Sequence, residues 1–346
     1  MNKQQFIKSH LLSRSILSYL LLPLSWLYAL ILLLRRLIFL SLPFLKFKSS
    51  IPLICIGNIS SGGTGKTPFV IFLSRYLQKR GLKIAIITRG YKGDFENSNT
   101  LISNYHQVFD LANKAGDEAY LLSQKLPGVP VIVGRKRIKS IHFLEKNFSD
   151  LDYIILDDAF QYLKLNYFKT FVIFNGVSPF GNGFSLPAGI LREPLFNTFF
   201  ADYIVFNSYK DIPPKLNSYN KPILKVSYQV KSIVDYQGKC YTFPELAEKN
   251  LALMSAIGIP ESFENTIKIC GLSFTKHFIF PDHFDYKDPS TLQKIENSLH
   301  TDKIDFLLVT EKDQTKLSHI NHKLPTLTVI TEFDMEASGL LYLESL

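Results

Sequence analysis

Short apolar runs alternate with helical patterns between residues 53 and 206. After position 66 the pattern is helical, because Phe69, Val70 and Leu73 share one helix face and Gly81 ends it. Alternating strands and helices predict an α/β fold, in which a parallel sheet carries helices on both faces. The predicted helices include residues 119–125 and 138–146, and the predicted strands are residues 53–56, 83–88, 129–133, 153–156, 171–174 and 203–206.

The pattern changes after residue 221. Short antiparallel strands fit residues 224–228, 232–235 and 239–242, and further apolar runs follow at 251–256, 274–280, 306–310 and 326–330. A chain of 346 residues also exceeds the usual size of one hydrophobic core. We therefore predict a nucleotide-binding domain over residues 49–222 and a second, smaller α/β domain over residues 223–346, joined by the short antiparallel strands.

Residues 94–113 are polar and show no regular period. This stretch lies between two of the predicted strands. It is predicted to be an irregular, mobile loop over the nucleotide.

The N-terminal segment is the most apolar part of the chain. Residues 15–34 carry no charge, and Arg35 and Arg36 follow directly. A helix of this length can span a bilayer, or it can lie in one leaflet with Trp26 and Tyr28 near the headgroups. A cleaved signal peptide does not fit, because the run is too long and no small-residue cleavage site follows. Residues 1–48 are predicted to be a membrane anchor, with a buried core helix as the alternative.

A glycine-rich segment separates the first predicted strand from the first helix. Residues 57–68 read Gly-Asn-Ile-Ser-Ser-Gly-Gly-Thr-Gly-Lys-Thr-Pro. This strand, glycine-rich turn and Gly-Lys-Thr helix start are the context that a phosphate-binding loop (P-loop) requires. Glycines let backbone N–H groups approach phosphate oxygens, and the helix N-terminus adds positive potential. The residues predicted to bind ATP are Gly62, Gly63, Thr64, Gly65, Lys66, Thr67 and Pro68.

Two side chains of this loop have distinct predicted roles. Lys66 reaches the β- and γ-phosphates, and the Thr67 hydroxyl binds Mg²⁺. The strict pattern has glycine six residues before the lysine, where this chain has Ser60. Because Gly-Lys-Thr still follows a strand and opens a helix, we predict ATP or GTP binding; the alternative is an ordinary glycine-rich turn.

The predicted strand 153–156 ends in Asp157 and Asp158. A carboxylate at the C-terminal end of such a strand lies beside the phosphate-binding loop and holds Mg²⁺, directly or through water. Paired acids at a strand end can also be merely solvated. Combined with the glycine-rich loop, they favour a nucleotide site.

Composition restricts the classes of partner that the chain is expected to bind. The formal charge of +9 favours an anionic partner, such as nucleic acid, an acidic lipid surface or a phosphorylated substrate. The three cysteines show neither metal-ligand spacing nor an even disulfide set, which fits a reducing cytosolic environment.

Eight segments, in their order along the chain, resemble the tetraacyldisaccharide 4′-kinase family, the lipid A 4′-kinases of Gram-negative bacteria. The family's usual Gly, His and Pro are replaced by Ala159, Tyr162 and Ala119, whereas the carboxylates and Gln161 are retained. No role of the family's histidine therefore carries over to position 162. The matching segments are residues 57–68, 88–93, 116–118, 157–161, 181–183, 186–194, 280–284 and 310–313.

The resemblance implies transfer of the ATP γ-phosphoryl group to the 4′-hydroxyl of a membrane-borne tetraacyldisaccharide 1-phosphate. The expected location is the cytoplasmic face of the inner membrane. The expected partners are this lipid and the membrane surface, with no nucleic acid and no obligate protein partner. ATP and Mg²⁺ are the expected cofactors.

The resemblance also implies roles for single residues. Asp157 is the main Mg²⁺ carboxylate, with Asp158, Gln161 and Glu193 as further Mg²⁺ or water partners. Arg192 is a candidate for stabilising charge on the transferring phosphoryl group, with a surface salt bridge as the alternative. Arg137 either contacts substrate phosphate or belongs to an ordinary basic helix start. Asp117 and His283, from the two predicted domains, form a pair that deprotonates the acceptor hydroxyl. The segment 310–313 matches the family with no mechanism beyond a turn and helix cap.

Two other classes of protein share parts of this pattern. Membrane-associated regulatory ATPases of the partitioning type carry a lysine just before the Gly-Gly of the loop, and Ser61 stands there instead. A nucleic-acid-binding NTPase is suggested by charge alone. Neither a basic run interleaved with aromatic residues nor a helicase-type motif set supports it.

Overall fold

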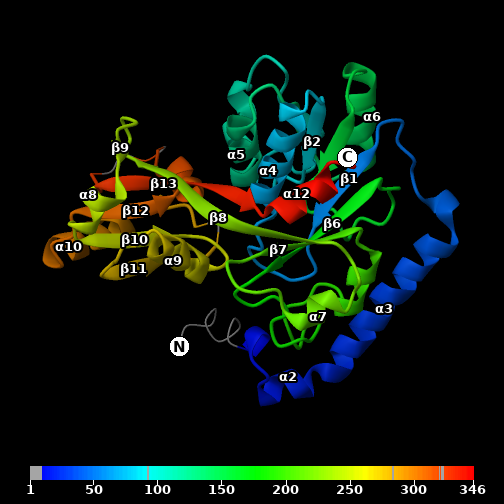
Figure 1. The fold of residues 1–346 in the computed structure, drawn as a ribbon, viewed down its shortest axis with the longest axis horizontal. Coiled ribbons are helices and arrows are strands. Elements are labelled where there is room, and N and C mark those ends of the chain that lie inside the picture. The colour runs from blue at the N-terminus through cyan, green and yellow to red at the C-terminus, as the bar shows by residue number, and fades with distance from the viewer. Residues whose placement is uncertain (1–9, 92, 283, 319, 321–322) are drawn as a thin grey trace. The chain divides into compact units, whose positions relative to one another are not determined.

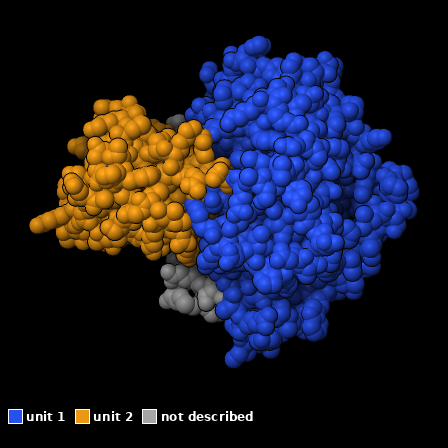
Figure 2. Space-filling view, viewed as in Figure 1, with its two compact units in different colours: residues 1–227, 335–346 blue, residues 228–334 orange. Residues whose placement is uncertain are grey.

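The computed structural model describes residues 10–91, 93–282, 284–318, 320 and 323–346. Its described residues form two compact units, which Figure 2 shows in different colours. Unit 1 comprises Met1–Ser227 together with Met335–Leu346, and unit 2 comprises Tyr228–Asp334. Strands β8 (Ile223–Val234) and β13 (Thr326–Met335) carry the chain from one unit to the other.

Unit 1 is built on a sheet with the strand order β3-β4-β2-β5-β1-β6-β7-β8. Figure 1 labels β1, β2, β6, β7 and β8 of this sheet. Every neighbouring pair is parallel except β3 and β4. The strands predicted between residues 53 and 206 are confirmed within a few residues. Their bounds are β1 Leu53–Gly57, β2 Ile84–Thr88, β4 Val131–Val133, β5 Tyr153–Leu156, β6 Lys169–Asn175 and β7 Tyr203–Asn207. Strand β3, Thr100–Ser103, was not among the predicted strands.

Helices cover both faces of this sheet. One face presents Cys55 and Val172 to a core that includes Leu144 of α6 (Arg137–Asn147). The neighbouring strand residues point to the opposite face, where Phe171 packs on Phe69 of α4 (Lys66–Lys79) with ring centroids 5.6 Å apart. The predicted α/β architecture is confirmed. The other short elements are α5 Asp117–Lys125, α7 Pro214–Asn217, η1 Pro43–Leu45, η2 Asp110–Lys114 and η3 Leu195–Phe200.

The prediction of an irregular loop over residues 94–113 is wrong in part. Strand β3 (Thr100–Ser103) pairs with β4 in antiparallel orientation, and the short helix η2 (Asp110–Lys114) follows. The strand is only four residues long and lies at the sheet edge. So short a strand gives almost no periodic signal, and pairing with β4 supplies its order.

The C-terminal segment belongs to unit 1. Gly339 of α12 (Ala337–Leu343) approaches Leu224, and Arg80 donates from Nη1 to the Leu343 carbonyl at 3.1 Å. The Tyr153 hydroxyl donates to the Leu346 carbonyl at 3.0 Å. The boundary between the two units therefore differs from the predicted domain ranges. Strand β8 crosses this boundary, and the last twelve residues, 335–346, belong to unit 1 instead of the second domain.

Unit 2 is a smaller α/β unit. Its strand order is β11-β10-β12-β13-β8, and β9 forms an antiparallel hairpin with β8. The two expected strands at residues 224–228 and 232–235 are one continuous strand, β8. The remaining elements are β9 Cys240–Tyr241, β10 Leu251–Ser255, β11 Lys276–Ile279, β12 Phe306–Thr310, α8 Phe243–Ala247, α9 Pro260–Ile269, α10 Pro289–Thr301 and α11 Glu311–Leu317.

The N-terminal segment forms α2 (Ile16–Leu20) and α3 (Leu22–Ser41). Helix α3 is long and apolar enough to cross a membrane, and only 11% of its apolar window is buried. The alternative of a buried core helix is therefore wrong. A wide face of α3 is exposed and apolar; its residues include Leu24, Trp26, Leu27, Leu30, Ile31, Leu34, Leu37 and Ile38.

A narrow face of α3 binds unit 1 through polar side chains. Ser25 Oγ donates to the Ser185 carbonyl at 2.9 Å, and the Tyr28 hydroxyl donates to the Arg192 carbonyl at 2.9 Å. Arg36 forms a buried ion pair with Glu193, with 2.6 Å between Nη2 and Oε2. These contacts place α3 against the segment that carries Arg192 and Glu193.

The Arg36–Glu193 pair gives a direct test of this packing. Arg36→Ala leaves the Glu193 carboxylate buried without a counter-charge, which costs about 3–5 kcal/mol of unfolding free energy. Arg35→Ala is the matched control, because Arg35 is exposed and donates to the Gln161 carbonyl. We expect chemical denaturation in detergent to show a large loss for Arg36→Ala and little change for Arg35→Ala. Equal losses would contradict the packing.

Candidate active site

The glycine-rich loop lies between β1 and α4, as the sequence predicts. Gly62 and Gly65 have positive φ angles, +103° and +91°, a region that residues with a side chain rarely adopt. Gly65 is the N-cap of α4, so Lys66 and Thr67 are the first residues of the helix. A glycine-rich loop that opens a helix at its N-terminus is the arrangement that binds anions such as phosphate.

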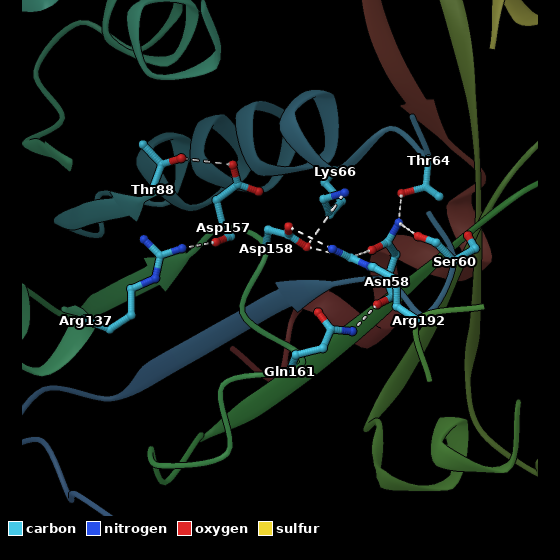
Figure 3. A network of polar contacts seen from close by, with 10 residues as sticks. All are labelled: Asn58, Ser60, Thr64, Lys66, Thr88, Arg137, Asp157, Asp158, Gln161 and Arg192. Carbon is cyan, nitrogen blue, oxygen red and sulfur yellow. Dashed lines mark hydrogen bonds and ion pairs between the residues drawn. The ribbon is translucent and has the colours of Figure 1, made fainter. Parts of the chain in front are cut away.

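Asn58 supports the loop from within (Figure 3). Its side-chain amide donates to the Ser60 carbonyl at 2.8 Å and to Thr64 Oγ1 at 2.9 Å. Asn58 is fully buried, and its Oδ1 accepts a hydrogen bond from Arg192. No role for Asn58 was predicted from the sequence. A polar residue directly after a buried strand is the signal that could have identified it.

Asp157 lies at the C-terminal end of β5, the parallel neighbour of β1. It is 2% exposed, and its Oδ2 accepts a hydrogen bond from Thr88 at 3.3 Å. Its Oδ1 is buried and has no hydrogen-bond partner among the described residues. Burial raises the pKa of Asp157 to about 7, and the negative charges of Glu118 and Asp158 contribute. The charges of Lys66 and Arg137 only partly offset this rise.

Asp158 holds two cations (Figure 3). Arg192 binds both carboxylate oxygens, at 2.8 and 3.2 Å, and Lys66 Nζ lies 3.8 Å from Oδ1. Burial favours the neutral form, but the charges of Lys66 and Arg192 outweigh it and hold the pKa of Asp158 well below its usual range. Asp158 has a positive φ of +48°, an uncommon conformation for aspartate. The structure therefore brings Lys66, Asp158 and Arg192 together.

The other residues predicted for this region have different surroundings. Arg137 is buried and donates to the carbonyls of Asp157, at 2.8 Å, and Gly134, at 3.2 Å. Burial lowers the pKa of Arg137 from its usual range. Gln161 donates to the Asn58 carbonyl at 2.7 Å. Glu193 accepts from Arg36 and Asn197, both at 2.6 Å, so it connects this region to α3.

The residues at the end of β5 fit a magnesium ion. Among the described residues, no group of three or more His, Cys, Asp or Glu side chains could hold a metal ion. Mg²⁺ in nucleotide sites needs fewer protein ligands, because phosphates and waters complete its shell. The unpartnered Oδ1 of Asp157 and the hydroxyl of Thr67, which opens α4, supply the oxygen ligands that Mg²⁺ prefers.

The pair predicted to deprotonate the acceptor is described only in part. Asp117 is the first residue of α5 in unit 1, and Gly116 before it has a φ of +94°. The negative charge of the neighbouring Glu118 adds to the effect of burial in raising the pKa of Asp157, which no sequence pattern predicts. His283 lies outside the described residues. Asp282, next to it in unit 2, forms an ion pair with Lys312 at 3.1 Å.

The loop before α4, with Asp157 at the end of the adjacent parallel strand, defines a P-loop nucleotide-binding protein. A family model described as "Tetraacyldisaccharide-1-P 4′-kinase" (LpxK) matches residues 17–341. The chain belongs to this family, and the resemblance inferred from the eight segments is confirmed.

Relatives and a solved structure agree with this assignment. The tetraacyldisaccharide 4′-kinase of Methylobacillus flagellatus is 35% identical, with 85% of this chain and 82% of that protein covered. That of Pelobacter propionicus is 31% identical, with 88% and 84% covered. The crystal structure of the "apo" form of Aquifex aeolicus LpxK in complex with ATP superposes with a TM-score of 0.73. It is 27% identical, and the match covers 95% of this chain and 99% of that one.

The raised pKa of Asp157 predicts a pH-dependent effect of its replacement. Its folded-state pKa of about 7 exceeds the unfolded value, so its contribution to stability is complete below about pH 4 and is lost as the pH rises through 7. Asp157→Asn cannot lose this proton. Without Mg²⁺ or nucleotide, we expect the melting temperature of Asp157→Asn to rise relative to that of wild type as the pH increases from about 5 to about 8. A difference independent of pH would contradict the buried, ionisable state of Asp157.

Proposed function

We propose that this chain is an ATP-dependent kinase that transfers the γ-phosphoryl group to the 4′-hydroxyl of tetraacyldisaccharide 1-phosphate. One observation carries the proposal: a P-loop with Lys66 faces the carboxylates that follow β5, in a chain that belongs to the tetraacyldisaccharide-1-P 4′-kinase family. Family membership favours this activity over a regulatory ATPase.

ATP is the proposed phosphoryl donor. The relative from Aquifex aeolicus was crystallised with ATP and matches 95% of this chain. The backbone of Gly62–Pro68 would hold the phosphates, with Lys66 on the β- and γ-phosphates. Arg192, held beside Lys66 by Asp158, would stabilise charge on the transferring group. Asp158 would thus hold the Lys66 and Arg192 side chains close together until a phosphate group replaces its carboxylate as their partner.

Thr67 and Asp157 are the proposed Mg²⁺ ligands. When bound, the ion neutralises charge on the β- and γ-phosphates. Asp158 and Gln161 are proposed to hold water molecules that complete the coordination shell of the ion. Glu193, predicted as a further ligand, is held by Arg36 and Asn197, and we propose that it couples the anchor helix to the site.

The proposed mode of membrane attachment is monotopic, at the cytoplasmic face of the inner membrane. Ser25, Tyr28 and Arg36 hold one face of α3 on unit 1, so a full span would have to break these polar contacts. The opposite face is apolar and exposed, which suits a helix lying in one leaflet. ATP is available on the cytoplasmic side. The lipid acceptor would be reached from the same surface.

Charges on the exposed face of α3 should release the protein from membranes. Leu27 and Ile31 are each 55% exposed, so Leu27→Asp with Ile31→Asp should fold and bind ATP normally. We expect this double variant to lose most co-sedimentation with anionic vesicles. Leu341→Asp is the control, because Leu341 of α12 is 65% exposed outside the anchor. Unchanged sedimentation of the double variant would contradict the monotopic attachment.

The activity is tested with an unselected acceptor pool. Purified protein is incubated in detergent with Mg²⁺, γ-labelled ATP and total lipid from a Gram-negative bacterium. We expect label in one class of disaccharide lipid. Equal ATP hydrolysis with and without lipid, and no labelled lipid, would instead indicate a regulatory ATPase.

A further inference from the structure

The stretch between β6 and η3 contains two segments that match the family, residues 181–183 and 186–194. The proposed phosphoryl-transfer site uses only Arg192 and Glu193 of this stretch. We call residues 181–193 the bridging segment, because hydrogen bonds join it both to the phosphate-binding loop and to helix α3. Its contacts therefore bear on how the loop is held.

The bridging segment pairs with the first residues of the phosphate-binding loop through its main chain. The Ser61 amide donates to the Ile190 carbonyl at 2.8 Å, and the Arg192 amide donates to the Ile59 carbonyl at 2.7 Å. The residues between these two hydrogen bonds form an antiparallel β-bridge. Figure 3 shows Ser60 and Arg192 at this junction. The backbone of residues 59–61, which leads directly into the glycines of the loop, is thus held by the bridging segment.

Helix α3 binds the same segment through two side chains. Ser25 is 2% exposed, and its hydroxyl accepts from the Ala188 amide and donates to the Ser185 carbonyl, both at 2.9 Å. The Tyr28 hydroxyl donates to the Arg192 carbonyl at 2.9 Å. Arg192 is therefore bound through its amide to the loop and through its carbonyl to α3.

The bridging segment is also tightly folded on itself. The buried side-chain amide of Asn182 donates to the Ala188 carbonyl at 2.8 Å, and Asn182 Oδ1 accepts from the Phe184 amide at 3.0 Å. A Cβ added at Gly189 would clash with Asn182 Oδ1 and with the Phe184 carbonyl oxygen. Because so closely packed a segment cannot absorb a displacement internally, a shift at its contacts with α3 is passed to the backbone that pairs with the loop.

We propose that Ser25 and Tyr28 of α3 are positioning residues for nucleotide binding, which act through the bridging segment to fix the backbone of residues 59–61. The inference rests on the ATP site of the proposed function. Both side chains act on the loop through main-chain hydrogen bonds of the bridging segment. The helix proposed to attach the protein to the membrane therefore also sets its affinity for ATP.

ATP affinity, measured by calorimetric titration in detergent with Mg²⁺, tests this inference. We expect Ser25→Ala to weaken ATP binding about tenfold, a usual size for coupling between separate sites. Ser18→Ala is the matched control, because the Ser18 hydroxyl is equally buried but donates to the Ser13 carbonyl at 3.1 Å, within the N-terminal segment. Tyr28→Phe is a second variant, which keeps the ring and removes only the hydroxyl bound to Arg192. It should weaken ATP binding in the same direction.

Two further measurements separate positioning of the loop from a general loss of stability. In the phosphoryl-transfer assay, Ser25→Ala and Tyr28→Phe should raise KM for ATP more than they lower kcat, as expected when a binding contact is disturbed. Amide hydrogen exchange in residues 59–61 should be faster in Ser25→Ala than in wild type or Ser18→Ala.

The outcomes distinguish this inference from the proposed function. Unchanged ATP affinity in both Ser25→Ala and Tyr28→Phe overturns the inference, as does an equal loss in Ser18→Ala. Weakened ATP binding by these two variants of a protein that phosphorylates no lipid would support the inference and contradict the proposed lipid kinase. Wild-type protein that bound no ATP would overturn the proposed nucleotide site, and the inference with it.

Discussion

Lys66→Ala is expected to lower kcat by about 10²–10³-fold and to leave the fold intact. The change removes a cation that would bear on the transferring phosphoryl group, and losses of this size follow removal of one charge-stabilising donor. Lys66 lies at the first position of α4, and its contact with Asp158 is long, at 3.8 Å. Little packing depends on it, so the melting temperature should stay close to wild type.

Lys79→Ala controls for a general loss of charge on the same helix. Lys79 is exposed in the last turn of α4, far along the helix from the loop. Its replacement should leave kcat unchanged. If Lys66→Ala retained activity within about threefold of wild type, the phosphate-binding role of the loop could not be maintained.

The second large effect is expected from Asp117 and His283, which we propose act as one unit in deprotonating the acceptor hydroxyl. Asp117→Ala and His283→Ala should each lower kcat by about 10²–10⁴-fold, the usual contribution of general base catalysis. KM for ATP should change little. The double variant should be hardly worse than either single variant, because removing half of a coupled unit disables it.

The kcat values of wild type, the two single variants and the double variant are measured with saturating lipid acceptor and compared. His300→Ala is the control for unit 2, because His300 is exposed at the end of α10. Losses that multiply would assign independent roles, such as lipid positioning by His283 and organisation of the metal site by Asp117. The proposed pair would then have to be abandoned.

The sheet of unit 1 and its phosphate-binding loop could be predicted because their signals are local. A buried parallel strand is a continuous apolar run, and the loop needs glycine where φ is positive, as at Gly62 and Gly65. The position of Asp157 beside the loop could be predicted in the same way, because neighbouring parallel strands present their C-terminal ends at one edge of the sheet. These features need no knowledge of distant contacts.

The features that were missed depend on contacts between distant segments. In the sequence, Arg36 is only a charge at the end of an apolar run. In the structure it forms an ion pair with Glu193, 157 positions later in the chain. Helix α12 joins unit 1 because β13 leads back to it, which no short pattern can reveal. Arg137 was left open between two roles, and only the fold places its guanidinium on backbone carbonyls.

The most direct test of the central claim uses a defined acceptor. Pure tetraacyldisaccharide 1-phosphate is incubated with the protein, Mg²⁺ and ATP, and the product is examined by mass spectrometry and ³¹P NMR. We predict one added phosphate, as a monoester at the 4′ position, with one ADP formed per lipid phosphorylated and no product from Lys66→Ala. ADP release at the same rate without acceptor, or a phosphate at any other position, would contradict the account.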